Sequence, residues 1–162
     1  MNIFDYAMQM ELDGKAFYER LAADANSEGL KTIFSSMAID ENKHYELFKQ
    51  MKDEAGALTM ADSTALDGAK NIFTELQKKG TAISPDTKSL EAYRYAMQVE
   101  ADSATLYQEA AEKETQQEIR DLLLRIAVEE RKHLNILENV FEFVNAPNQS
   151  LVWAEFSNLK EF

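Results

Sequence analysis

The chain has 162 residues, a formal net charge of −12 and no cysteine. Without cysteine it cannot form disulfides, thiolate zinc sites or cysteine-ligated iron–sulfur centres. The negative charge argues against a nucleic-acid partner, because phosphate binding depends on clustered Lys and Arg. No apolar run is long enough for a membrane span, and the N-terminus does not resemble a signal peptide. We therefore expect a cytoplasmic protein that contacts neither nucleic acid nor membrane.

Apolar residues recur at helical spacing along four stretches of the chain, which predicts an all-α protein. Scarce glycine (5) and proline (2) also favour long helices. Polar breaks are expected at 26–29 and 115–117, and Asn145-Ala146-Pro147-Asn148 ends the last helix. The four stripes cover residues 4–25, 30–51, 93–110 and 119–144.

A connector of about residues 54–84 separates the second and third helices. Ser84 can cap the third helix, and Pro85 fits its first position. A connector this long can cross the length of a bundle, so we expect helices 2 and 3 to run parallel. Residues 1–146 would then form a four-helix bundle. Residues 147–162 would form a short helical tail that packs on the bundle or on a second subunit.

The two halves of the chain repeat each other at an offset of 89 residues. Segment 7–11 (Ala-Met-Gln-Met-Glu) aligns with segment 96–100 (Ala-Met-Gln-Val-Glu), and no gap is needed as far as His44. Two diverged copies of one helical hairpin explain this match. Shared composition of two amphipathic helices is the alternative, but it does not readily explain two Glu–Glu–His sets with identical spacing.

Six polar residues occupy the apolar stripes, where a core is expected. A buried ionised carboxylate must be paired, protonated or bound to a metal. Within each Glu-x-x-His motif, the side chains at i and i+3 lie on one helix face and can reach one ion. Each repeat adds one Glu from its first helix, which completes the ligand pattern of ferritin-like two-metal bundles. The alternative is a metal-free bundle with buried His–Glu pairs. The candidate ligands are Glu11, Glu41, His44, Glu100, Glu130 and His133.

Four further residues are candidates for supporting these ligands. Tyr18 and Tyr107 each follow a lone Glu by seven residues, so their hydroxyls can bond a ligand carboxylate or supply a proton or electron. Asp40 and Glu129 each precede the Glu of a Glu-x-x-His motif. Either can accept the second ring N–H of the histidine on the facing helix. The alternatives are core tyrosines with satisfied hydroxyls and solvated helix charges.

The chain resembles the rubrerythrin branch of the ferritin-like superfamily, in a short form without a rubredoxin domain. The resemblance covers about residues 3–145 and rests on the six candidate ligands. It implies an oxo- or hydroxo-bridged di-iron centre in which Glu11 and His44 bind one iron and Glu100 and His133 the other. The Glu residues of the two Glu-x-x-His motifs would bridge. Manganese or zinc could also bind oxygen and nitrogen ligands of this kind.

Two departures from the rubrerythrin pattern affect the expected function. A rubredoxin domain with four Cys usually delivers electrons, so here a separate protein must supply them. The family also carries an additional Glu three residues after the lone Glu of helix 3. That position is Ser103 here, and its repeat partner is Gly14. The two small residues either leave room for dioxygen or peroxide or serve close helix packing.

The leading hypothesis, by resemblance, is an oxidoreductase that reduces hydrogen peroxide or dioxygen with two iron ions and a separate electron donor. A homodimer is expected from the family and from the apolar tail. The first alternative is a ferroxidase or iron-storage protein, which needs a large cage. The second is a non-catalytic helical bundle that binds a partner through its aromatic tail.

Overall fold

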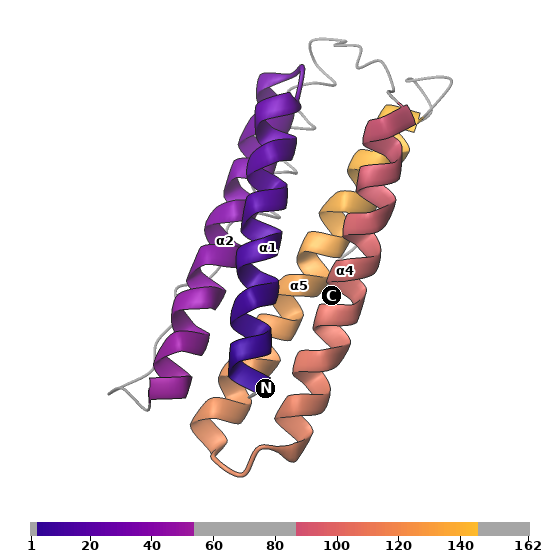
Figure 1. Ribbon diagram of the computed structural model, residues 1–162. Coiled ribbons are helices and arrows are strands. Elements are labelled where there is room, and N and C mark those ends of the chain that lie inside the picture. The colour runs from indigo at the N-terminus through magenta and orange to yellow at the C-terminus, as the bar shows by residue number, and fades with distance from the viewer. Residues whose placement is uncertain (1–2, 54–86, 146–162) are drawn as a thin grey trace.

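The computed structural model describes residues 3–53 and 87–145, which form four long helices (Figure 1). The predicted all-α four-helix architecture is confirmed. The connector at 54–84 and the tail at 147–162 lie outside the described residues, so the expectations for them stay predictions. The helices are α1 (Ile3–Asp24), α2 (Glu28–Asp53), α4 (Thr87–Lys113) and α5 (Gln117–Asn145).

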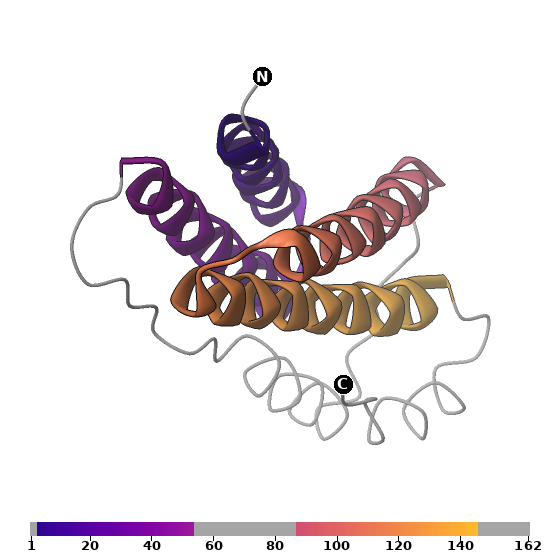
Figure 2. The ribbon, with the colours of Figure 1, turned by 90° about the horizontal axis from the view of Figure 1, so that it is seen from below.

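The helices form two antiparallel hairpins, α1–α2 and α4–α5, which pack together through α2 and α5. In Figure 1, α2 ends at the opposite end of the bundle from the start of α4, so these helices run parallel, as predicted. No pair of Cα atoms from α1 and α4 lies within 8 Å. The view along the bundle shows α1 and α4 standing apart on the same side (Figure 2).

Two helices begin earlier than the sequence pattern predicts. Helix α2 starts at Glu28, inside the expected break, because Ser27 takes the capping position and its carbonyl accepts the Lys31 N–H at 3.0 Å. Glu28 then places negative charge at the helix N-terminus, where the helix dipole favours it. Helix α5 likewise includes Gln117. Local capping decides where α2 begins, and the hydrophobic periodicity of the sequence carries no information about capping.

The apolar core consists of two clusters that lie toward opposite ends of the bundle. One gathers around Phe34 and Met37 of α2 and the C-terminal half of α5. The other gathers around Phe48 of α2 and Ile126 of α5. The ligand candidates lie between the clusters along the chain of each helix. The apolar clusters thus enclose a central polar layer.

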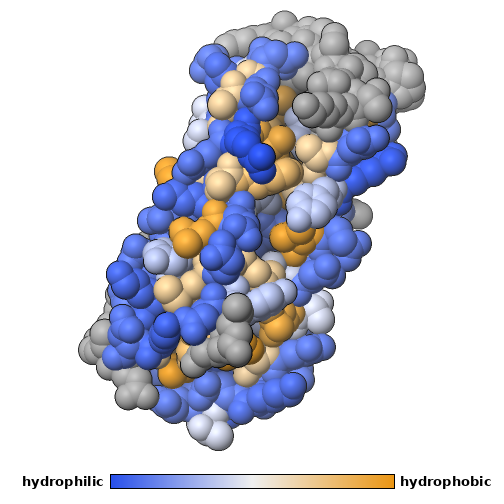
Figure 3. Space-filling model, in the orientation of Figure 1, coloured by the Kyte–Doolittle hydropathy of each residue, from blue (hydrophilic) through white to orange (hydrophobic). Residues whose placement is uncertain are grey.

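Hydrophilic residues cover most of the surface in Figure 3, and apolar residues gather along the line between α1 and α4. Within residues 3–53 and 87–145, no helix has an apolar stretch sufficient to cross a bilayer.

Candidate metal centre

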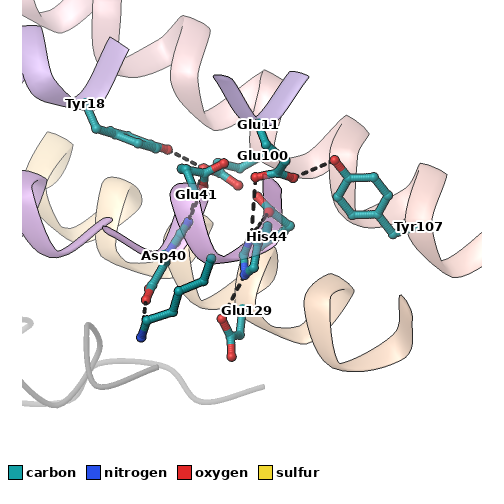
Figure 4. A network of polar contacts seen from close by, with 11 residues as sticks. Glu11, Tyr18, Asp40, Glu41, His44, Glu100, Tyr107 and Glu129 are labelled. Carbon is teal, nitrogen blue, oxygen red and sulfur yellow. Dashed lines mark hydrogen bonds and ion pairs between the residues drawn. The ribbon is translucent and has the colours of Figure 1, made fainter. Parts of the chain in front are cut away.

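All four helices contribute to one buried polar cluster at the middle of the bundle. The six candidate ligands are at most 3% exposed, and two of them, His44 and His133, are completely buried. Glu41 and His44 project from α2, and the lone residues Glu11 and Glu100 project from α1 and α4 (Figure 4). The second Glu-x-x-His pair, Glu130 and His133, lies on α5. The structure therefore brings together every residue that the sequence analysis selected as a ligand candidate.

The cluster resolves into two overlapping groups of possible ligand atoms. The first contains Glu11, Glu41, His44 and Glu130, and the second contains Glu41, Glu100, Glu130 and His133. The ligand atoms within a group all lie within 4.8 Å of one another. Glu41 and Glu130 belong to both groups. The arrangement is that of two adjacent cation sites which share two carboxylates.

The shared carboxylates face the Nδ1 atoms of the histidines at ion-pair distance. His44 Nδ1 lies 2.9 Å from Glu130 Oε1, and His133 Nδ1 lies 2.9 Å from Glu41 Oε1. Both carboxylate atoms and His133 Nδ1 are nevertheless buried without a hydrogen-bond partner, as is Glu100 Oε2.

This spacing fits two ligands of one metal ion, and in the metal-free protein it also pairs protonated histidines with carboxyl oxygens. Two ligands that bind one ion at right angles, with bonds of about 2.1 Å, lie about 3 Å apart and aim at the ion. Buried polar atoms without partners are rare in native proteins and call for an explanation such as a bound ion. The donor set of carboxylate oxygens and imidazole nitrogens suits iron, manganese or zinc. The cluster thus has the properties of a metal-binding site.

The outward-facing nitrogen of each histidine is held by an acidic residue of the other hairpin. His44 Nε2 lies 2.8 Å from Glu129 Oε1 (Figure 4). His133 Nε2 lies 2.8 Å from Asp40 Oδ2. With Nε2–H donating to the carboxylate, Nδ1 is the nitrogen that faces the cluster, and it offers a lone pair when the histidine is neutral. These are the contacts expected from the sequence; their effect on a metal stays a prediction.

The two tyrosines also cross between hairpins. Tyr107 of α4 donates a hydrogen bond of 2.6 Å to Glu11 Oε1 on α1, and Tyr18 of α1 donates to Glu100 Oε1 on α4. Each tyrosine therefore orients the lone Glu of the opposite repeat. Burial raises the pKa of both hydroxyls well above the ordinary tyrosine value, and the nearby carboxylates raise it further. Both hydroxyls hence remain protonated hydrogen-bond donors.

The four carboxyls among the candidate ligands divide into two pairs by the direction of their pKa shift. Burial and the charges of neighbouring carboxylates raise the pKa of Glu41 and Glu130 well above the usual value. Burial also acts on Glu11, but a hydrogen bond with Glu41 and the charge of His44 outweigh it and lower the pKa to about 2. The pKa of Glu100 is lowered against burial by Glu130 and His133. In the metal-free protein the shared carboxyls therefore hold protons and the outer ones are ionised.

The pKa values of both histidines are raised in the metal-free protein, so both rings are protonated. Burial alone would lower the pKa of His44, but the charge of Glu11 and hydrogen bonds with Glu11 and Glu129 raise it to about 10. The pKa of His133 is raised well above its usual value against burial, chiefly by the charge of Glu100 and the hydrogen bond to Asp40. Protons thus supply the positive charge that the carboxylates require. A metal must displace them in order to bind.

Two features of the site were not predicted from the sequence. Lys43 Nζ lies 3.7 Å from Asp40 Oδ1, so a cation sits behind one of the two histidine partners. The sequence contains the signal for this contact, because Lys43 follows Asp40 by three residues and the two side chains therefore lie on one helix face. The second feature is a cavity of about 480 Å³ between α1 and α4 that reaches the carboxylates. It depends on how the hairpins dock, which periodicity within one helix does not report.

Gly14 and Ser103 both line this cavity. A Cβ atom at position 14 would lie 3.0 Å from Glu41 Oε2, so the glycine makes room for a shared carboxylate. This contact shows that the Glu41 side chain packs against α1 at Gly14. Room for dioxygen or peroxide beside the two small residues stays a prediction.

Comparison with known proteins identifies the family. The rubrerythrin family model matches residues 2–141, which include all of α1, α2 and α4 and most of α5. Neither the comparison with curated proteins nor that with solved structures gave a significant match. The match agrees with the ferritin-like bundle and with the buried carboxylate and histidine cluster. The chain therefore belongs to the rubrerythrin family.

Proposed function

We propose that the cluster holds two iron ions and that the protein is an oxidoreductase which reduces hydrogen peroxide or dioxygen. Glu11 and His44 would hold one ion, and Glu100 and His133 the other. Glu41 and Glu130 would be shared, because they alone belong to both groups of ligand atoms. The observation that carries the proposal is this pair of overlapping, fully buried ligand groups with hydrogen-bonding atoms left unpaired.

The charge of the site supports two divalent ions. Four carboxylates and two neutral histidines carry four negative charges when deprotonated, and two divalent ions neutralise them. A single ion would leave two buried negative charges uncompensated, which is costly in a low-dielectric core. When bound, two irons supply the two electrons that reduction of peroxide to water requires.

The protein's own residues position the ligands and supply protons. Tyr18 and Tyr107 hold the outer carboxylates through hydrogen bonds, and each hydroxyl is a proton donor at the edge of the cluster. Asp40 and Glu129 fix the ring orientation and tautomer of the histidines. The cavity between α1 and α4 gives a small oxidant a route to the carboxylates.

The proposal includes a separate electron-donor protein, because the chain has no cysteine with which to build a rubredoxin-type centre. We also propose that the protein is a homodimer and that it acts in the cytoplasm. Gel filtration separates this assembly from the iron-storage alternative, since storage needs a large cage. A dimer supports the reductase proposal, and a cage of many subunits would favour storage.

The first test is metal content after anaerobic loading with ferrous ion, in the wild type and in Glu130→Ala. We expect two irons per wild-type chain and a large loss in the variant, because a shared ligand serves both positions. Stopped-flow mixing of the loaded protein with peroxide should then show reoxidation faster than that of free ferrous ion. A folded wild-type protein that binds no metal would refute the site, and slow reoxidation would refute the reductase.

A further inference from the structure

The cavity between α1 and α4 is much larger than peroxide or dioxygen requires. Its volume is about 480 Å³, and its lining includes the four carboxylates of the candidate metal centre. A water molecule occupies about 30 Å³ of liquid, so a molecule of two oxygen atoms would fill only a small part of it. Pockets for organic ligands span about 300–1,000 Å³. The volume therefore matches a small organic molecule.

The wall of the cavity is rich in aromatic rings. Tyr6 and Phe17 of α1 and Tyr95 of α4 line it, and the Phe17 and Tyr95 ring centroids lie 5.9 Å apart at 56°. Tyr6 and Tyr95, which are equivalent in the repeat, are 50% and 64% exposed, so they stand at the outer edge. Met10 and Val99 add apolar surface. Aromatic walls of this kind favour an aromatic ligand, through edge-to-face and offset contacts.

The charge of the lining decides which polar group such a ligand can carry. Six acidic residues and one Arg line the cavity, so an anionic ligand would meet net repulsion. The buried atoms Glu41 Oε1 and Glu130 Oε1 have no hydrogen-bond partner. Glu41 and Glu130 hold protons in the metal-free protein, and a neutral hydroxyl can accept from a carboxyl O–H as well as donate to a carboxyl oxygen. The hydroxyl oxygen can also bind a metal ion. The lining thus favours a hydroxyl over a carboxylate.

We propose that this cavity is a binding site for a single-ring phenol. The ring lies among Tyr6, Phe17 and Tyr95, and the hydroxyl points to the shared carboxylates Glu41 and Glu130. The site exists without metal, so the inference goes beyond the proposed reductase. Only direct contact between the phenol oxygen and an iron rests on the proposed metal centre.

The first experiment uses the full-length metal-free protein and phenol as the probe. Titration followed by NMR should show saturable shifts in the aromatic resonances of Tyr6, Phe17 and Tyr95. Val99→Trp fills the cavity and should weaken phenol binding at least tenfold. Val128→Trp is the matched control, because Val128 is 37% exposed on α5 and does not line the cavity. Absence of saturable shifts in the wild type, or equal binding in both variants, would overturn the proposal.

The second experiment uses the iron-loaded, oxidised protein with phenol and azide in parallel. Phenol should produce a visible charge-transfer band that Val99→Trp removes, whereas azide, which needs little space, should bind both proteins alike. Retained azide binding also shows that the variant is folded. If Val99→Trp does not fold, Tyr95→Ala, an exposed position, should weaken phenol binding several-fold, and unchanged binding would count against the site. Failure to load iron would refute the metal centre alone, because the metal-free titration decides the phenol site separately.

Discussion

The hairpins α1–α2 and α4–α5 present the same ligand types to the cluster but differ in the residues behind those ligands. Each supplies a lone Glu, a Glu-x-x-His pair and a tyrosine that reaches across to the other hairpin. Behind the ligands, Gly14 of one hairpin corresponds to Ser103 of the other, and Asp40 corresponds to Glu129. Repeat symmetry accounts for the cluster itself, and the differences around it make the two proposed metal positions unequal.

The largest expected effect concerns what both halves share, namely the protons held in the metal-free site. His44, with its pKa raised to about 10, stabilises the fold below its unfolded value of 6.5, and this contribution is lost as pH rises toward 10. The raised pKa values of His133, Glu41 and Glu130 act in the same direction. Each extra proton on the folded state lowers stability by about 1.4 kcal/mol per pH unit of increase.

Denaturant unfolding of the metal-free protein should therefore show stability that falls steadily from about pH 5 to pH 9. Below pH 4.5 the trend should reverse, because Glu11 has a folded pKa of about 2 and its contribution is lost as pH falls toward that value. Metal-loaded protein should not lose stability between pH 5 and 9, since metal binding requires the deprotonated ligands. A metal-free protein that gains stability over this range would contradict the proton assignments.

The next largest effect comes from removing the acidic partners of the histidines. Asp40→Ala should weaken metal binding at the position of His133, and Glu129→Ala at the position of His44, because each histidine loses its hydrogen-bond acceptor. A loss of about 10- to 100-fold is expected for such partners. Calorimetric titration with cobalt or zinc measures it, and Glu46→Ala, on the exposed surface of α2, is the control. Affinities within twofold of wild type would show that the contacts do not support the metal.

A smaller effect on metal affinity should distinguish substitution of Gly14 from substitution of Ser103. Gly14→Ala places a methyl group 3.0 Å from Glu41 Oε2, so the carboxylate must shift and metal affinity should fall about tenfold. In the metal-free protein the better helix propensity of alanine, worth up to about 1 kcal/mol, and the same carboxylate shift oppose each other, so stability should change by less than about 1 kcal/mol. Ser103→Ala adds no atom and should leave affinity within about twofold. Equal effects of both substitutions on metal affinity would remove the proposed asymmetry.

The smallest effect concerns Lys43. It pairs with Asp40 at 3.7 Å, whereas in the part of the chain that the structure describes no lysine or arginine pairs with Glu129. Lys43→Ala should make His133 a slightly stronger ligand, by about two- to fivefold in affinity, as suits a partly exposed ion pair. Lys132→Ala, at the equivalent position of the repeat, is the control for loss of charge. NMR of the two histidine N–H protons in cobalt-loaded protein reports each position, and identical responses would contradict the expectation.

Much of this site was predictable from the sequence because it is encoded by spacing within helices. The interval of three residues in Glu41-x-x-His44 sets a helix face, and the repeat places the second copy opposite it. The contacts of Asp40 and Glu129 with facing histidines follow from the same reasoning. The early start of α2 at Glu28 was not predictable from periodicity, because capping by Ser27 decides it.

Other features depend on how one hairpin docks on the other, and no local pattern contains this information. The pairing of Tyr18 with Glu100, instead of with a ligand of its own hairpin, is one such feature. The volume of the cavity between α1 and α4 is another.

The position of the cluster on the axis between two repeats has an evolutionary consequence. Before duplication, a single hairpin could have completed the same site only by pairing with an identical copy, and every substitution would then have appeared twice around the metals. Fusion into one chain removes that constraint. Each half is then able to change separately, as the pairs Gly14 and Ser103, or Asp40 and Glu129, have done. Covalent linkage of the halves is what allows two chemically distinct metal positions to arise from one ancestral half-site.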